Sequence, residues 1–207
     1  VERAARAFAG LGASVTEVSV PAHGQAPQLW NLLAVAEGAE LFAGGRGGCL
    51  ASYYRDDLLA AYDEARRLGA AELPDVVKAM LLIGLSMRDA LGDRPRAAVL
   101  AQRPVLRQAY DRALGEVDLL LLPTTPQRAT EIPDAEAPLP LRFLRSVEMV
   151  ANTCPFNLTG HPALSLPCGL AGGLPIGMML VGRHGEDAAV LGAGHHYQAE
   201  VLSPPSP

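Results

Sequence analysis

The segment "ANTCPFNLTGHPALSLPCGL" (residues 151–170) decides how this sequence is interpreted, because it joins several backbone restraints to an alternating apolar stretch. Proline fixes φ at Pro155, Pro162 and Pro167, and Gly160 can adopt backbone angles that are closed to other residues. A chain restrained in this way has little conformational entropy left to lose when it binds a ligand. The segment therefore predicts a rigid surface placed directly before a buried strand.

Small polar side chains in and near this segment are candidates for ligand contacts. Asn152, Thr153 and Asn157 lie within it, and Thr124 and Thr125 follow an apolar run, where ligands often bind at the ends of strands. The alternative is that these side chains cap neighbouring backbone groups, which Asn and Thr commonly do in loops. Phe156 is expected in the core or at the rim of a pocket. The residue types leave both alternatives open.

Apolar stretches of strand length lie on both sides of the segment. "VDLLLLPTTP" (117–126) is a continuous apolar run, typical of a strand in a sheet that helices cover on both faces. Two alternating stretches, residues 162–169 and 175–182, are joined by "LAGGL" and predict a hairpin. Alternation in "ASVTEVSVP" (13–21) predicts a further half-buried strand, which Pro21 ends.

Apolar residues at helical spacing predict helices around these strands. The expected ranges are residues 1–10, 28–42, 56–69, 73–92, 94–115, 142–151 and 186–200. Pro104 is expected to kink the helix at 94–115 or to mark its true start. Helices on either side of buried strands make the expected fold class α/β, in one domain covering residues 1–207.

Composition excludes several classes of function. With 49% apolar and 19% charged residues, the 207-residue chain is expected to fold around a sizeable core. The net charge of −5 gives no reason to expect nucleic acid or an anionic membrane as a partner. The three cysteines, Cys49, Cys154 and Cys168, lack C-x-x-C spacing, so a reducing cytoplasm is the expected location. The sequence starts without Met and in a helical pattern, which predicts a piece of a longer protein.

Three stretches in a fixed order carry a resemblance to a known family. They are "LLLPTTP" (120–126), "ANTCPFNLTGHPALSLPCG" (151–169) and "GLPIGMMLVGRHGEDAAVL" (173–191), preceded by "LWNLLAVAEGAELF" (29–42). Together they resemble the C-terminal part of the amidase signature family, and most of all the acyl-amide amidases of actinobacteria. The likeness covers the chain from Ala13 to about Tyr197.

The resemblance implies a mixed, twisted sheet flanked by helices on both faces, and hydrolysis of a carboxamide to an acid and ammonia. In the family, a Ser nucleophile is activated through a second Ser, held in a cis peptide, by a neutral Lys. This sequence lacks the Gly/Ser-rich loop with its paired serines, and its only lysine, Lys78, lies among apolar residues of a predicted helix. We therefore assign no catalytic residue, no metal and no cofactor to the chain, and expect the catalytic half to precede it.

The resemblance also implies substrate contacts. Trp30 and Val150 match positions that line the acyl pocket, and with Asn152, Thr153 and Phe156 they are the candidate substrate-binding residues. For Trp30 the alternative is an ordinary core aromatic. The expected partners are a small-molecule amide and the missing N-terminal half, with a homodimer as an open alternative and no nucleic acid or membrane.

Four rival interpretations remain at this stage. A thiol hydrolase would use Cys154 or Cys168 with His161. A metal site would combine His184, His195, His196 and an acidic residue, but adjacent residues such as His195 and His196 face different sides of a helix and chelate poorly. The chain could also be a non-catalytic module that completes a site elsewhere. The last rival is one component of a glutamine-dependent amidotransferase.

Overall fold

The computed structural model describes residues 1–42 and 56–202, so Cys49 lies outside the described residues. Contacts within the chain group it into two compact units, which are described separately. Unit 1 consists of Val1–Pro27, Arg103–Glu131 and Glu148–Pro207, and unit 2 of Gln28–Gln102 and Ile132–Val147.

Unit 1 is built on a three-stranded antiparallel sheet in the order β1-β3-β2. The strands are β1 (Leu120–Pro123), β2 (Ala163–Ala171) and β3 (Leu174–Val181). Gly172 and Gly173 join β2 to β3 with φ angles of 61° and 79°, the left-handed conformation that a two-residue hairpin loop requires. The predicted hairpin is therefore confirmed.

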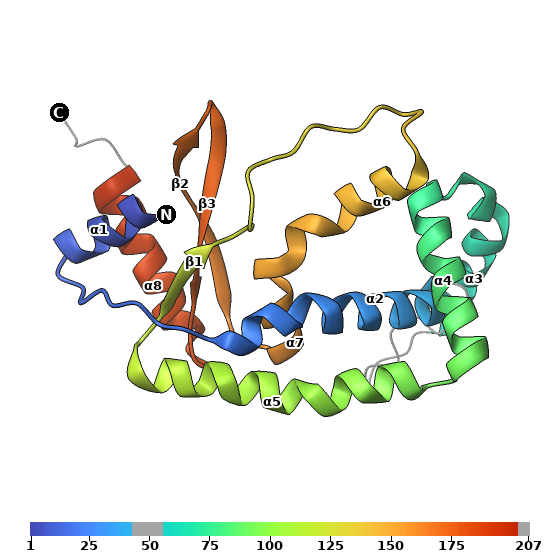
Figure 1. Cartoon of the computed structure of the whole chain (residues 1–207), viewed down its shortest axis with the longest axis horizontal. Helices are drawn as coiled ribbons and strands as arrows, with labels where there is room; N and C mark the ends of the chain where they lie inside the picture. The colour runs from blue at the N-terminus through green and yellow to red at the C-terminus, as the bar shows by residue number, and fades with distance from the viewer. Residues whose placement is uncertain (43–55, 203–207) are drawn as a thin grey trace. The chain divides into compact units, whose positions relative to one another are not determined.

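Two helices cover one face of this sheet, α1 (Glu2–Gly10) and α8 (Asp187–Tyr197) (Figure 1). Phe8 of α1 stacks on Tyr197 of α8, with ring centroids 5.0 Å apart. A Cβ added at Gly194 would lie 2.4 Å from Leu164 Cδ2, so α8 approaches β2 closely at this glycine. The buried residues of this cluster are Ala4, Leu166, Met178, Leu180, Val190 and Tyr197.

Short helical turns complete unit 1. They are η1 (Pro21–Gln25), η3 (Glu148–Asn152), α7 (Cys154–Thr159) and the π-helical turn η4 (Gln198–Leu202), and the C-terminal part of α5 (Arg94–Glu116) belongs to the same unit. Arg103 of α5 donates a hydrogen bond of 2.8 Å to the carbonyl of Leu158 in α7. This bond ties the end of α7 to the long helix.

The regular secondary structure of unit 2 is helical in its described residues, and residues 132–138 form a loop. Its elements are α2 (Ala26–Phe42, whose first two residues belong to unit 1), α3 (Asp56–Gly69), η2 (Ala70–Glu72), α4 (Asp75–Leu91), the first turns of α5, and α6 (Leu139–Val147). A Cβ added at Gly84 of α4 would lie 2.4 Å from the carbonyl oxygen of Val35 and 2.6 Å from Ala39 Cβ. Only glycine at position 84 allows α2 and α4 to approach this closely.

One sequence prediction fails locally, and one of two alternatives for Pro104 is excluded. Residues 13–20 form no strand, because an extended segment becomes a strand only when a neighbour pairs with it, and Val15 is 53% exposed. Pro104 does not mark the start of α5, since the helix begins at Arg94 and runs through this position, and the alternative of a kink at Pro104 stays a prediction. Proline costs one backbone hydrogen bond there, which the remaining turns of this long helix tolerate.

The chain is therefore a largely helical protein with a small antiparallel sheet, which is the coarse form of the predicted α/β class. Among residues 1–42 and 56–202, no helix is both long and apolar enough to cross a lipid bilayer.

Candidate functional site

The restrained segment at residues 151–170 contains a short helix, α7, which the sequence patterns did not predict. Pro155 occupies the first turn, where its missing N–H costs nothing, and Gly160 ends the helix with φ 81°. The N–H of Gly160 donates to the carbonyl of Phe156 over 2.7 Å. The restraints at Pro155 and Gly160 thus fix a single buried turn.

A hollow of about 340 Å³ lies between α7 and the sheet of unit 1. Ser165 of β2 pairs with Met179 of β3, and Leu166 pairs with Met178 in the core beneath α8. Because successive side chains of a strand point to opposite faces, Ser165 and Met179 lie on the face that α1 and α8 leave open. The lining residues are Thr124, Thr153, Phe156, Asn157, His161, Ala163, Ser165 and Met179.

Two hydroxyl groups form the polar part of this hollow. Thr124 Oγ1 and Ser165 Oγ are hydrogen-bonded at 2.7 Å, across β3. Gly177 on β3 leaves room for them, because an added Cβ would lie 2.8 Å from Thr124 Oγ1. The backbone N–H of Thr124 also donates to the carbonyl of Gly177 over 3.0 Å. This arrangement places hydroxyl donors and acceptors beside the apolar side chains of Met179 and Phe156.

Asn152 belongs to a hydrogen-bonded chain and is absent from the lining of the hollow. Its Nδ2 donates to the carbonyl of Pro123 at 2.8 Å, so its Oδ1 faces His23 Nε2 at 3.2 Å. His23 Nε2 must then carry a proton. In the neutral ring, His23 Nδ1 accepts from the hydroxyl of Tyr110 at 2.7 Å. Burial raises the pKa of Tyr110, which keeps that hydroxyl protonated as a donor.

The candidate residues predicted from the sequence fall into three groups. Thr153 and Phe156 line the hollow together. Asn152 and Val150 belong to η3 and are absent from the lining of the hollow. The carbonyl of Val150 accepts from Thr153 Oγ1 at 3.2 Å, which is the capping alternative. Trp30 lies half-buried on α2 in unit 2, so its substrate contact stays a prediction.

Sequence reasoning missed Ser165, Met179 and His161 as lining residues. The alternation of β2 and β3 was readable, but it does not tell which of two faces a helix covers. That choice depends on α8, which packs on the leucines of β2. Only the packing of α1 and α8 on the other face of the sheet shows that Ser165 and Thr124 face the hollow.

The cysteine chemistry considered as a rival lacks support at Cys154. This residue is fully buried, its Sγ lies 3.8 Å from the carbonyl of Ala151, and burial raises the pKa of its thiol to about 11. Both ring nitrogens of His161 have other partners, Thr159 Oγ1 at 2.8 Å and Asp111 Oδ1 at 3.1 Å. A thiolate nucleophile activated by His161 does not fit these contacts.

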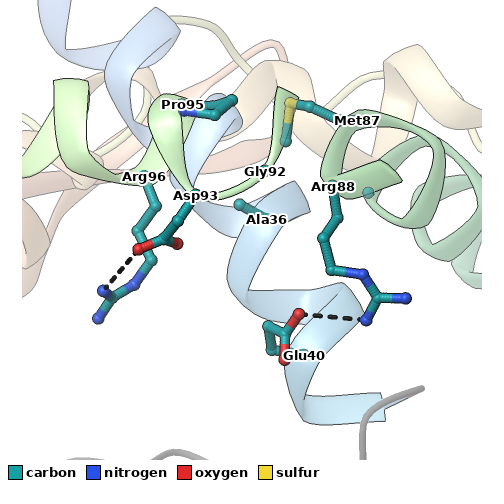
Figure 2. A pocket seen from close by; sticks show the side chains of 9 residues that line it. Ala36, Glu40, Met87, Arg88, Gly92, Asp93, Pro95 and Arg96 are labelled. Atoms are coloured by element: carbon teal, nitrogen blue, oxygen red, sulfur yellow. Dashed lines mark hydrogen bonds and ion pairs between the residues drawn. The ribbon is translucent and has the colours of Figure 1, made fainter. Parts of the chain in front are cut away.

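A second hollow lies within unit 2, at the end of α4, but its volume is only about 30 Å³. Figure 2 shows that the charged side chains around it reach toward one another. Arg88 Nη1 lies 3.3 Å from Glu40 Oε1, and Arg96 Nη1 lies 4.0 Å from Asp93 Oδ2. A space of this size holds a single water molecule, so it is no candidate for a substrate.

Known proteins are similar to this chain in sequence and in fold. A family model described as "Amidase" matches residues 1–191. A Rhodococcus erythropolis protein described as "Uncharacterized protein in nthA 5'region" is 38% identical over 172 residues, which are 82% of this chain and 86% of that protein. An enantioselective amidase of Rhodococcus rhodochrous is 35% identical over 86% of this chain and 35% of its own length. A glutamyl-tRNA(Gln) amidotransferase component from Methanosarcina barkeri is 34% identical over 91% of this chain and 38% of its own length.

Solved structures agree with these matches. A crystal structure described as an amidase superposes with a TM-score of 0.70 and 28% identity, over 96% of this chain and 40% of that one. A 6-aminohexanoate cyclic dimer hydrolase shares the fold with a TM-score of 0.67 and 24% identity, over 99% of this chain and 42% of that one. The chain thus spans about two fifths of the length of each of these two structures.

Proposed function

This chain belongs to the amidase family, and from that premise we propose that it supplies one wall of the acyl-binding pocket of an enzyme that hydrolyses carboxamides. The single observation that carries the proposal is the hollow beside α7, in which Thr153 and Phe156 meet the open face of the sheet. Its volume of about 340 Å³ falls within the range of small-molecule sites, roughly 300–1,000 Å³.

The chemistry of the lining suits the carbon skeleton of an amide. Phe156 and Met179 offer apolar surface, and the hydroxyl pair of Thr124 and Ser165 offers a few directed hydrogen bonds. Holding the carbonyl in a near-attack position can supply roughly 7 kcal/mol or more of barrier reduction. A wall built from paired strands and a short buried helix is rigid enough for this task. Val150 in η3 is a further acyl contact that we propose. A substrate contact of Trp30, on α2 in unit 2, is a separate proposal that rests on the family resemblance.

The groups that break the bond are proposed to lie outside this chain. Its sequence has no Gly/Ser-rich loop with paired serines, and its only lysine, Lys78, donates to the carbonyl of Ala71 over 2.8 Å on the surface. In this proposal, the mixed sheet with helices on both faces is completed by the same missing portion.

Two other functions have an observation in their favour. The amidotransferase identity of 34% favours a component that transfers ammonia to a charged tRNA. A non-catalytic module is favoured by the Rhodococcus erythropolis protein, of which this chain covers 86%. Sequence identity does not separate the hydrolase from the amidotransferase, because the identity to the enantioselective amidase is 35% and that to the amidotransferase is 34%. We place the hydrolase first because the hollow supports an acyl contact.

The test begins with the coding sequence upstream of Val1, joined to this chain and expressed as one protein. We expect ammonia release from benzamide or propionamide by the joined protein and none by the 207-residue chain alone. Ser165→Phe should fill the hollow and lower kcat/KM by about tenfold or more, a loss of about 1.4 kcal/mol in transition-state binding. Leu170→Phe, on the exposed end of the same strand, is the matched control.

Three results would contradict the proposal. Ammonia release by the chain alone that Trp30→Ala abolishes would place the catalytic groups within it. An upstream sequence without a lysine-bearing strand and a serine-rich loop would favour the module. Activity that requires glutamine and a charged tRNA would favour the amidotransferase.

A further inference from the structure

Three side chains from separate parts of unit 1 meet beside the hollow. Asp111 lies on α5, His161 follows α7, and His184 follows β3. One nitrogen of each histidine and one carboxylate oxygen of Asp111 lie within 4.8 Å of one another. We propose that Asp111, His161 and His184 form a binding site for a divalent transition-metal ion of the Zn²⁺ class. The inference is independent of the proposed amidase function.

The geometry is close to what such an ion requires. Zinc binds histidine nitrogen and carboxylate oxygen at about 2.0–2.2 Å, so two ligand atoms of a tetrahedral site lie about 3.3 Å apart. His161 Nε2 and Asp111 Oδ1 already lie 3.1 Å apart. A movement of about 1.5 Å or less, estimated from the same bond lengths, would bring His184 to the third position. Two histidines and one carboxylate leave further positions open for water.

His184 provides the observation that points to a missing ligand. Its Nε2 is buried and has no hydrogen-bond partner among the residues that the structure describes. Buried polar atoms in proteins nearly always have a partner, because an unsatisfied group costs about 1–3 kcal/mol. The ring of His184 lies against that of His161, with centroids 4.1 Å apart. A cation bound through Nε2 would give this nitrogen its partner.

His161 is held in a way that suits a metal ligand. Its Nδ1 lies 2.8 Å from Thr159 Oγ1, a contact that orients the ring from behind. Without metal, Nε2–H donates to Asp111 and Nδ1 accepts from Thr159. With metal, the proton moves to Nδ1 and donates to Thr159, so the exchange of tautomers releases no net proton.

One nearby charge opposes the ion. Arg107 Nε lies 3.7 Å from Asp111 Oδ2, on the next turn of α5, and its side chain is about half exposed. Repulsion weakens cation binding until this side chain turns into solvent. The proposal also differs from the histidine site considered from the sequence, because His195 and His196 are exposed on α8, outside the group that His184 joins here.

The test is a titration of the untagged 207-residue chain with Zn²⁺ near neutral pH, followed by calorimetry and by thermal unfolding. We expect one ion per chain, a higher Tm that EDTA reverses, and no response to Mg²⁺, which prefers oxygen ligands. His184→Gln and Asp111→Asn should each raise Kd by about tenfold or more, whereas Arg107→Gln should lower it. His196→Gln, a histidine removed from the surface of α8, is the matched control.

Asp111 is exposed and His184 is only half-buried, so both variants are expected to fold, which circular dichroism checks. The absence of saturable binding would overturn the proposal. Titrations of His184→Gln and Asp111→Asn that match the unsubstituted chain would also overturn it. Thiolate charge-transfer bands in the Co²⁺ spectrum would assign the ion to cysteines and have the same consequence.

Discussion

The side-chain amide of Asn152 donates a hydrogen bond to the backbone carbonyl of Pro123, 2.8 Å away and 29 positions earlier in the chain. The oxygen of the same amide faces His23 Nε2 at 3.2 Å. One side chain therefore joins the end of β1 to the 3-10 helix η1. In the restrained segment, Asn152 thus holds the end of β1, next to Thr124 of the hollow. Thr153 and Phe156 of the same segment line the hollow.

Removal of this amide should destabilise unit 1. Asn152→Ala leaves the carbonyl of Pro123 and Nε2 of His23 without their partner, so we expect the free energy of unfolding to fall by about 1–2 kcal/mol. Urea denaturation followed by circular dichroism measures the change. Asn157→Ala, an exposed asparagine of the same segment, is the control and should change stability by less than about 0.5 kcal/mol. Equal effects of the two variants would contradict the assigned role.

The close crossing of α2 and α4 predicts an asymmetry between two glycines. Gly84→Ala drives a methyl group into the carbonyl oxygen of Val35, 2.4 Å away, and should cost about 1–3 kcal/mol despite the better helix propensity of alanine. Gly38→Ala meets only the flexible end of Met80, at 3.0 Å, and should be neutral or stabilising. The Tm of each variant in thermal unfolding measures the difference. A Gly84→Ala variant with a raised Tm would contradict the close approach of α2 and α4.

The hairpin loop predicts which residues can replace its first glycine. Gly172 has φ 61° and Gly173 has φ 79°. Asparagine tolerates this region well, so Gly172→Asn should change Tm little. Gly172→Val should lower stability by about 1–2 kcal/mol, since a β-branched side chain is strained there. If both variants unfold at the same temperature, the loop does not have the left-handed conformation.

Alkaline pH should lower the stability of the fold through a buried thiol, Cys154, and a buried phenol, Tyr110. Burial raises the pKa of Cys154 from 9.0 to about 11. The unfolded chain, with the ordinary thiol pKa, releases its proton at lower pH than the folded chain, so stability is present below pH 9 and falls between pH 9 and about 11. Burial also raises the pKa of Tyr110, which acts in the same direction.

Urea midpoints measured between pH 8 and about 11 in the presence of reductant test this slope. Cys154→Ala should reduce the dependence of stability on pH more than Cys168→Ala does, because Cys154 is buried and Cys168 is only half-buried. A stability that rises over this pH range would contradict the assigned burial of the thiol. Iodoacetamide labelling near neutral pH should likewise leave Cys154 unmodified in the folded chain, which peptide mass spectrometry can follow.

Helices and the hairpin were predictable because their signals are local. Helical spacing located α1, α3 and α8 closely, and two glycines between alternating stretches identified the loop of the hairpin. The segment at 13–20 alternates just as clearly, yet forms no strand, because pairing depends on a neighbour that the alternation does not specify. Local sequence patterns therefore predicted helices and strands better than they predicted which strands pair.

The candidate site was only partly predictable for the same reason. Thr153 and Phe156 lie in the restrained segment at residues 151–170, and both line the hollow. Ser165 reaches the same space only through the register of β2 on β3. Asp111 and His161 are 50 positions apart and belong to different elements, so no spacing rule could bring them together.

The central position of β3 has a consequence for the dynamics of the chain. Its residues from Met178 to Val181 are nearly inaccessible and are hydrogen-bonded on both sides, by β1 and by β2. Amide protons exchange with solvent only when such bonds open, so deuterium should enter this strand last in unit 1. The two outer strands, each bonded along one edge in the described sheet, should take up deuterium earlier.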